Sequence, residues 1–268
     1  MLENTELAPD ACRDDPSSLD WEFDQLFGTF LEDVPPESFS APLPRIQNQT
    51  ENADTGMACT RFSMAHIVNS QNLRVTNETG LDIPEEIARD YWLAYVKAVP
   101  SASKEGATLQ SALEQFRKSG KITGFAKCNG WEKEAVSSYR LIHTGSIDGN
   151  WYKTKRTGIY TRRTDGKSLG HAFCIYAYEP GFFIAINSLG DGTFKIPEKM
   201  IGTLFTRYAV TDATDEESIS SYRKRIMDGI TIEDAKKALE AKVWNGTNPE
   251  APASRQEVAA MIYRALGK

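Results

Sequence analysis

The pattern of apolar residues changes near Gly124, and this change most limits the folds that the chain can adopt. Before this point, apolar residues recur at the spacing of helices that bury one face. These predicted helices are residues 59–69, 84–98 and 108–119. After it, runs rich in aromatic and β-branched residues are broken by glycine and aspartate, as in strands. These predicted strands are residues 139–143, 158–162, 171–178 and 182–187. The order predicts an α+β fold with a helical lobe, an antiparallel β lobe and a cleft between them.

The last two predicted strands are joined by Glu179-Pro180-Gly181, a combination typical of a tight turn. An antiparallel hairpin across this turn brings His171 and Asn187 roughly opposite each other. An asparagine oxygen in that position can accept the imidazole N–H and fix the tautomer of the ring. Side chains alternate along a strand, so Cys174 is expected on the opposite face from His171.

Cys59 follows a turn at Gly56 and begins the first predicted helix. Its sulfur is expected at the positive end of the helix dipole, which favours the thiolate, and a histidine cation nearby adds to this effect. A lone cysteine is more often a buried structural residue, and we read Cys12, Cys128 and Cys174 that way. The combination of Cys59 with His171 and Asn187 instead predicts a nucleophile, its base and the residue that orients the base.

The composition argues against several kinds of partner. A net charge of −6 is untypical of generic nucleic-acid binding, which usually needs a basic surface. No apolar run approaches the roughly 20 residues of a membrane span, and the acidic, polar first residues predict no signal peptide. The four cysteines and three histidines lack the spacing of a metal site. We therefore expect reduced thiols and no metal, nucleic-acid or membrane partner.

Several stretches of the chain resemble the papain-like cysteine peptidases. Residues 187–190, Asn-Ser-Leu-Gly, resemble the family's Asn-Ser-Trp-Gly, and residues 158–161 with 169–172 resemble the stretch that leads into its histidine. Residues 105–113 resemble the glycine-containing loop and helix of its left lobe. Residues 48–49, Asn-Gln, resemble the segment with its oxyanion-hole glutamine.

This resemblance implies a papain-like two-lobe fold and a cysteine endopeptidase that forms a thioester acyl-enzyme. Cys59 is then the nucleophile, His171 the acid and base, and Asn187 the residue that orients His171. Gln49 shares the oxyanion hole with the backbone N–H of Cys59. The resemblance implies no metal or organic cofactor, and a peptide or protein as substrate.

The chain departs from the family pattern upstream of the nucleophile. Gln49 stands ten residues before Cys59, further than in the family, so residues 51–54 resemble an insertion. Gln47 is the alternative to Gln49. In the family an aromatic residue follows the cysteine, whereas Thr60 follows it here.

A second departure lies in the motif after Asn187. Leu189 stands where the family has the tryptophan that shields the contact between histidine and asparagine from water. The disulfides of the secreted members also have no counterpart. These features resemble the bacterial and phage branch of the family, which implies a cytoplasmic or phage-associated location.

Three parts are predicted along the chain. Residues 1–43 form an acidic, proline-containing arm, and its aromatic patch at Trp21, Phe23 and Phe27 motivates the hypothesis that the arm covers the cleft. Residues 44–212 form the peptidase-like domain. Residues 213–268 form a small helical segment with helices near 232–242 and 255–265.

The C-terminal part has its own resemblance. Residues 244–266 resemble one S-layer-homology motif, a type that usually occurs in three copies and binds cell-wall polymers. The resemblance implies a cell-wall polymer as a further partner. The alternative is a helical appendage used for packing or oligomerisation.

Two other functions fit the same residues. One is a papain-like fold with a structural or binding role, for example in a phage particle. The other is an acyltransferase or transglutaminase that uses the same pair of Cys59 and His171. The sequence leaves the preferred substrate open.

Overall fold

The computed structural model describes residues 11–12, 34–51, 53–76, 85–165, 170–189 and 192–212. All of them belong to one compact unit, Met1–Thr214. The predicted C-terminal helices, the S-layer-homology-like residues 244–266 and the aromatic patch of the arm lie outside the described residues. The predicted division of the chain after residues 43 and 212 therefore stays a prediction.

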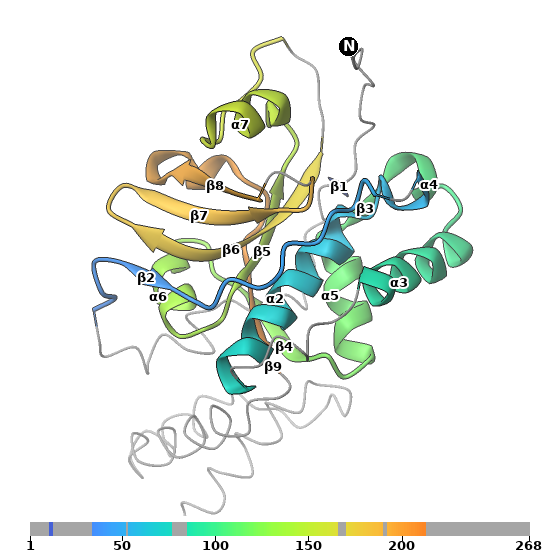
Figure 1. Cartoon of the computed structure of the whole chain (residues 1–268), viewed down its shortest axis with the longest axis horizontal. Helices are drawn as coiled ribbons and strands as arrows, with labels where there is room; N and C mark the ends of the chain where they lie inside the picture. Colours follow the sequence, from blue (N-terminus) through green and yellow to red (C-terminus); the bar gives the residue numbers. More distant parts are fainter. Residues whose placement is uncertain are drawn as a thin grey trace, which may run out of the picture. The chain divides into compact units, whose positions relative to one another are not determined.

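The first half of the unit is helical, as expected. Its helices are α2 (Cys59–Thr76), α3 (Glu85–Ala98), α4 (Ala102–Glu105) and α5 (Leu109–Lys118) (Figure 1). α2 continues beyond residue 69, where we expected it to end, because polar side chains in its later turns find buried partners. Ser70 donates to the carbonyl of Pro42 at 2.6 Å, and Gln71 donates to the carbonyl of Val210 at 2.9 Å. Within the described part of the chain, no helix has the length and apolar character needed to cross a membrane.

The strands of the second half, together with β2, form one sheet whose described strands pair in the order β4-β9-β5-β6-β7-β8, with β2 also paired to β6. They are β2 (Phe39–Ser40), β4 (Ile122–Lys127), β5 (Ile142–Ser146), β6 (His171–Glu179), β7 (Phe182–Asn187), β8 (Gly192–Pro197) and β9 (Tyr208–Asp212). Every pairing in this sheet is antiparallel. β6 and β7 form the predicted hairpin, with Glu179 opposite Phe182. The expected helical and antiparallel β halves are therefore confirmed.

Two strand predictions were wrong in position or type. The strand predicted at 139–143 begins only at Ile142, because Tyr139 adopts a positive φ of 59° in the turn before it. Residues 158–162 form only isolated bridges. They follow α7 (Trp151–Thr157), which ends at Gly158 with a left-handed φ of 67°, so their start is a helix cap.

Three further helical segments are short and connect longer elements. They are α6 (Glu132–Ser137), η2 (Ala53–Thr55) and η4 (Glu198–Thr203). Two residues of the predicted arm form β1 (Ala11–Cys12), which pairs in parallel with β3 (Ala107–Thr108). β3 leads directly into α5, so the part of the arm that forms β1 lies beside the helical half. Whether the arm covers a cleft stays a prediction.

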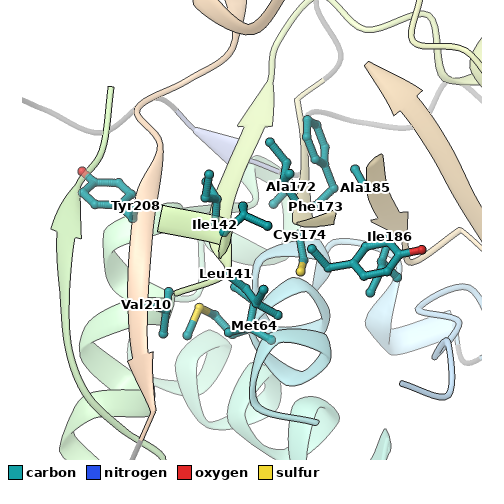
Figure 2. Packing of buried hydrophobic residues seen from close by; sticks show 14 of the residues in the cluster. Met64, Leu141, Ile142, Ala172, Phe173, Cys174, Ala185, Ile186, Tyr208 and Val210 are labelled. Atoms are coloured by element: carbon teal, nitrogen blue, oxygen red, sulfur yellow. The ribbon is translucent and has the colours of Figure 1, made fainter. Parts of the chain in front are cut away.

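α2 packs against β5, β6, β7 and β9 of the sheet and contributes to the main core. Met64 of α2 points toward Leu141 and Val210, with Ile142 and Cys174 in the same buried cluster (Figure 2). Truncating a buried residue of this size to alanine typically lowers stability by about 2–5 kcal/mol. The packing therefore fixes the first residue of α2 relative to β6.

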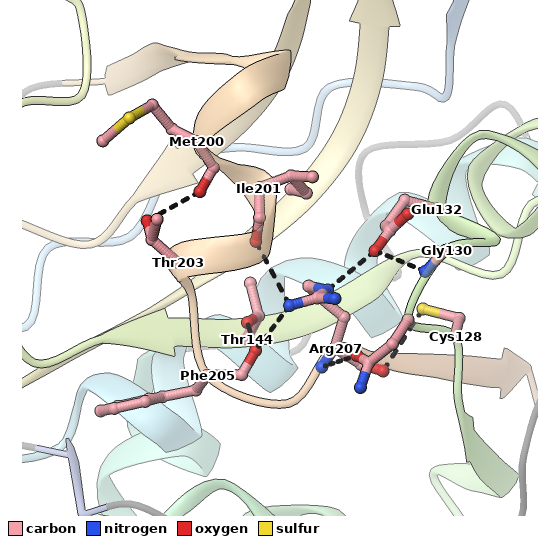
Figure 3. Close-up of polar contacts among 10 residues, drawn as sticks. Cys128, Gly130, Glu132, Thr144, Met200, Ile201, Thr203, Phe205 and Arg207 are labelled. Carbon is pink, nitrogen blue, oxygen red and sulfur yellow. Dashed lines mark hydrogen bonds and ion pairs between the residues drawn. The ribbon is translucent and has the colours of Figure 1, made fainter.

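A buried ion pair stabilises the entry of β9, the residues just before the strand begins. The guanidinium of Arg207 donates to Glu132 at 2.8 Å, and the same carboxylate oxygen accepts from the backbone N–H of Gly130 at 3.0 Å (Figure 3). Arg207 also donates to the carbonyl of Ile201 at 3.2 Å. The side chains of Arg207 and Glu132 are only 11% and 8% exposed, so water screens this pair weakly.

Candidate active site

Cys59 lies at the first position of α2, as the sequence predicted. The backbone N–H of Ala58 donates to the carbonyl of Thr55 at 2.9 Å, which closes the turn before the helix. The Cys59 sulfur is buried and accepts a hydrogen bond from the backbone N–H of Ala172 at 3.3 Å. The positive end of an 18-residue helix and a strand N–H thus both favour a negative charge on this sulfur.

His171 and Asn187 come together at the open end of the hairpin. Nε2 of His171 lies 2.8 Å from Oδ1 of Asn187, and both side chains are buried. Because the amide oxygen can only accept, this contact places the hydrogen on Nε2 and leaves Nδ1 as the proton acceptor. The same oxygen accepts the backbone N–H of Leu189 at 3.2 Å, which holds the amide in this orientation.

The hairpin register explains how His171 and Asn187 meet. Cys174 pairs with Ile186, so the two residues are not directly opposite but are offset along the strands. The side chains span that offset. His171 is followed directly by Ala172, whose backbone N–H donates to the Cys59 sulfur. The residue that carries the imidazole is therefore the neighbour in sequence of the residue that contacts the sulfur.

Gln49 is buried and joined to the segment that follows Asn187. Its backbone N–H donates to the carbonyl of Ser188 at 2.8 Å, and its Oε1 accepts from the Ser188 hydroxyl at 2.6 Å. Its Nε2 donates to the carbonyl of Gly56 at 2.8 Å, in the turn before Cys59. These contacts assign the amide with its N–H groups on the side of the nucleophile's turn.

The apparent insertion at residues 51–54 does not displace Gln49 from the site. It contributes to η2, and the hydroxyl of Thr55 donates back to the carbonyl of Gln49 at 2.5 Å. Gln47 takes a different place: its backbone N–H donates to Nε2 of His66 at 2.8 Å. The geometry therefore links Gln49, rather than Gln47, to Ser188 and the turn at Gly56.

Trp151 is a part of the site that sequence reasoning missed. It is the first residue of α7, it is buried, and its ring centroid lies 4.8 Å from that of His171 at an interplanar angle of 67°. The same indole packs against Phe173 and Phe194. Its local signal is Asn150, whose side chain caps this helix by accepting from the backbone N–H of Lys153.

Cys174 and Cys128 fit structural roles. Burial raises the pKa of the Cys174 thiol, and Cys174 pairs with His143 in the sheet. Burial also raises the pKa of Cys128, whose thiol donates to the carbonyl of Arg207 at 3.3 Å. Both stay protonated at neutral pH and are poor nucleophiles.

The other two histidines are also structural. Burial lowers the pKa of both His66 and His143 to about 3, so both are neutral at pH 7. His143 shares a hydrogen bond of 2.8 Å with the hydroxyl of Ser63. Among the described residues, no three side chains of the types that bind metals gather into a cluster.

Similarity to known proteins is found at the level of the fold. Neither the family models nor the curated proteins give a match to the sequence. Among solved structures, the digestive procathepsin L2 proteinase from Tenebrio molitor larval midgut matches with a TM-score of 0.53 and 16% identity, covering 76% of this chain and 78% of that chain. The Amb a 11 cysteine protease, a ragweed pollen allergen in its proform, matches with a TM-score of 0.50 and 13% identity, covering 72% and 70%. The chain has the papain-like two-lobe fold, with a helical left lobe and an antiparallel β right lobe.

Proposed function

We propose that the protein hydrolyses peptide bonds with Cys59 as nucleophile. The observation that carries the proposal is the contact of the Ala172 N–H with the Cys59 sulfur, one residue after His171, whose ring lies 2.8 Å from Asn187. A thiol at a helix N-terminus and a histidine with an assigned tautomer are the two parts that thiolate chemistry needs.

The reaction begins when the Cys59 thiolate attacks the peptide carbonyl. The backbone N–H of Cys59 and the Nε2–H of Gln49 stabilise the oxyanion that forms. The His171 imidazolium protonates the leaving amine, and a thioester remains on Cys59. His171 then activates the water that hydrolyses this thioester, while Asn187 keeps the ring in place.

Two further observations support a peptidase. The chain matches solved structures of a digestive proteinase and of a cysteine protease. Ser188, the residue directly after Asn187, also donates a hydrogen bond to Gln49. One short segment therefore orients both the histidine and the oxyanion donor. A purely structural use of the fold gives no reason for this arrangement.

Labelling with an epoxysuccinyl active-site probe tests the proposal. We expect covalent addition at Cys59, located by mass spectrometry, and loss of labelling in a Cys59→Ala variant. A Cys174→Ala variant serves as control and should label like the parent protein. A folded protein that gives no labelled Cys59 would exclude the peptidase and leave the structural or binding role.

Product analysis separates hydrolysis from acyl transfer. A peptidase releases a free carboxylate whether or not an amine acceptor is added, because water resolves the thioester. A transglutaminase or acyltransferase instead gives the amide of the added amine as its main product. Binding of a cell-wall polymer by residues 244–266, the phage or bacterial origin, and a cytoplasmic or phage-associated location stay predictions.

A further inference from the structure

Arg61 is a fully buried cation two residues after Cys59 in α2. Its guanidinium lies 4.0 Å from the ring centroid of Tyr95 and 5.8 Å from that of Trp92. It donates to oxygens of three neutral side chains at 3.0–3.1 Å. They are Thr60, Ser111 and Gln115. The group is thus enclosed by α2, α3 and α5.

Arg61 differs from Arg207 because no carboxylate accompanies it. Arg207 pairs with Glu132, whereas among the described residues no ion pair to Arg61 is present and its Nη2 has no hydrogen-bond partner. Burial lowers the pKa of Arg61 to about 10, which still leaves it charged at neutral pH. A buried charge without a counter-charge is unfavourable, so its position calls for an explanation.

Within the described part of the chain, two groups that can become negative act on the Arg61 cation. The charges that favour the Arg61 cation belong to Tyr95 and Cys59. Of these two groups, Cys59 is the one whose anion the helix N-terminus and the Ala172 N–H stabilise. The two side chains leave α2 in different directions, since the sulfur contacts Ala172 of β6 while the guanidinium contacts α3 and α5.

We propose that Arg61 is a positioning residue that holds a fixed positive charge behind the nucleophile and favours the thiolate form of Cys59. This inference rests on the proposed role of Cys59 as nucleophile. Arg61 acts through the low-dielectric interior of the helical lobe, without touching substrate. Two helix positions and one arginine side chain separate the charges by on the order of 10 Å. At an effective dielectric constant of about 20, this separation corresponds to about one pH unit.

The test measures the alkylation rate of Cys59 by iodoacetamide against pH, in the full-length protein. Mass spectrometry of the Cys59 peptide separates its signal from those of the other thiols. In Arg61→Met and Arg61→Gln, the midpoint of the profile should rise by about one pH unit relative to the parent. Arg61→Lys places an ammonium at the same position, and because burial readily lowers the pKa of a lysine, its midpoint should lie between that of the parent and those of the neutral variants.

Gln115→Met is the matched control. It removes the acceptor of the Arg61 Nε–H and loosens the contact between α2 and α5, but it leaves the charge in place. The alkylation midpoint of this variant should equal that of the parent. A midpoint that rises equally in Gln115→Met and Arg61→Met would assign the effect to packing and overturn the proposal.

Unchanged midpoints in both neutral Arg61 variants would also overturn it. If Arg61→Met fails to fold, the comparison of Arg61→Gln with Arg61→Lys decides the question. Alkylation needs no peptide turnover, so the outcome is independent of the peptidase assay. A protein with the predicted shift and no cleavage would keep the role of Arg61 and exclude only the proposed function.

Discussion

The indole of Trp151 lies edge to face against the imidazole of His171, with centroids 4.8 Å apart. Trp151 belongs to α7, whereas Leu189, two residues after Asn187, stands where the papain-like peptidases that the chain resembles have a tryptophan. The aromatic side chain that packs against His171 therefore comes from α7 and not from the segment after Asn187. Such a contact limits rotation of the imidazole and excludes water from one of its sides.

Replacing Trp151 tests whether its contact with His171 contributes to catalysis. Trp151→Leu should lower kcat/KM for a cleaved peptide by about tenfold, because the imidazole gains freedom to leave its reactive orientation. Trp151→Phe should retain most of the activity. The measurement is a pH profile of kcat/KM with a fluorogenic peptide.

Tyr208 provides the control, since it is equally buried but packs edge to face against Phe125, between β9 and β4. Tyr208→Leu should destabilise the protein and leave kcat/KM nearly unchanged at a temperature where the protein is folded. Equal kinetic losses in the two leucine variants would show that Trp151 acts only through stability.

The hydroxyl of Ser188 orients the amide of Gln49. In Ser188→Ala, the Oε1 of Gln49 loses the buried hydrogen bond of 2.6 Å that the Ser188 hydroxyl donates. We expect a loss of about 1–3 kcal/mol in the free energy of unfolding. Because the amide no longer holds its N–H groups toward the oxyanion, kcat should also fall about tenfold.

Ser70→Ala is the control for this hydroxyl. Ser70 lies in the later turns of α2, away from Cys59, and donates to the carbonyl of Pro42 at 2.6 Å. Its replacement therefore also removes a short hydrogen bond. The variant should lose stability but keep kcat. If both variants keep kcat, Gln49 does not depend on Ser188 for its orientation.

Much of the fold was predictable because the signals were local. The helix predicted at 108–119 forms as Leu109–Lys118, since Thr108 caps its start by accepting from the backbone N–H of Ser111. The hairpin was found because Glu179-Pro180-Gly181 dictates a tight turn. The order of Cys59, His171 and Asn187 predicted these three residues as one site, and the structure places Asn187 beside His171 and the Ala172 N–H beside the Cys59 sulfur.

The missed elements depend on distant partners. β4 carries Gly124 and is only partly buried, and it becomes a strand by pairing with β9, more than 80 residues further along. α7 spans seven residues, too few to display a helical period. Trp151 and Arg61 were missed for the same reason, since only the packing of separate elements brings them to His171 and Cys59.

Two buried histidines predict how stability depends on pH. The pKa of His66 is about 3 in the folded protein, against about 6.5 when unfolded, and His143 behaves alike. Below pH 6.5 the unfolded state binds protons that the folded state does not. The stabilisation is therefore complete above about pH 6.5 and is lost as the pH falls toward 3.

His66→Gln measures the share of one histidine. The glutamine oxygen can still accept the backbone N–H of Gln47, but it does not titrate. Between pH 8 and pH 5, the parent should lose about 2 kcal/mol more of its free energy of unfolding than the variant does. Urea titrations at the two pH values give this difference directly. Parallel losses in the two proteins would mean that His66 is protonated in the folded state.

The buried pair of Arg207 and Glu132 predicts a large asymmetry between single and double substitutions. Arg207→Met leaves the Glu132 carboxylate buried without its cation and should lower the free energy of unfolding by about 3–5 kcal/mol. Adding Glu132→Met should recover much of this loss, because it removes the uncompensated charge. Arg162→Met is the control: its ion pair with Asp148 involves a half-exposed arginine, so the loss should stay below about 1 kcal/mol. If Arg207→Met costs no more than Arg162→Met, water reaches Glu132, and the entry of β9 is held by the apolar core alone.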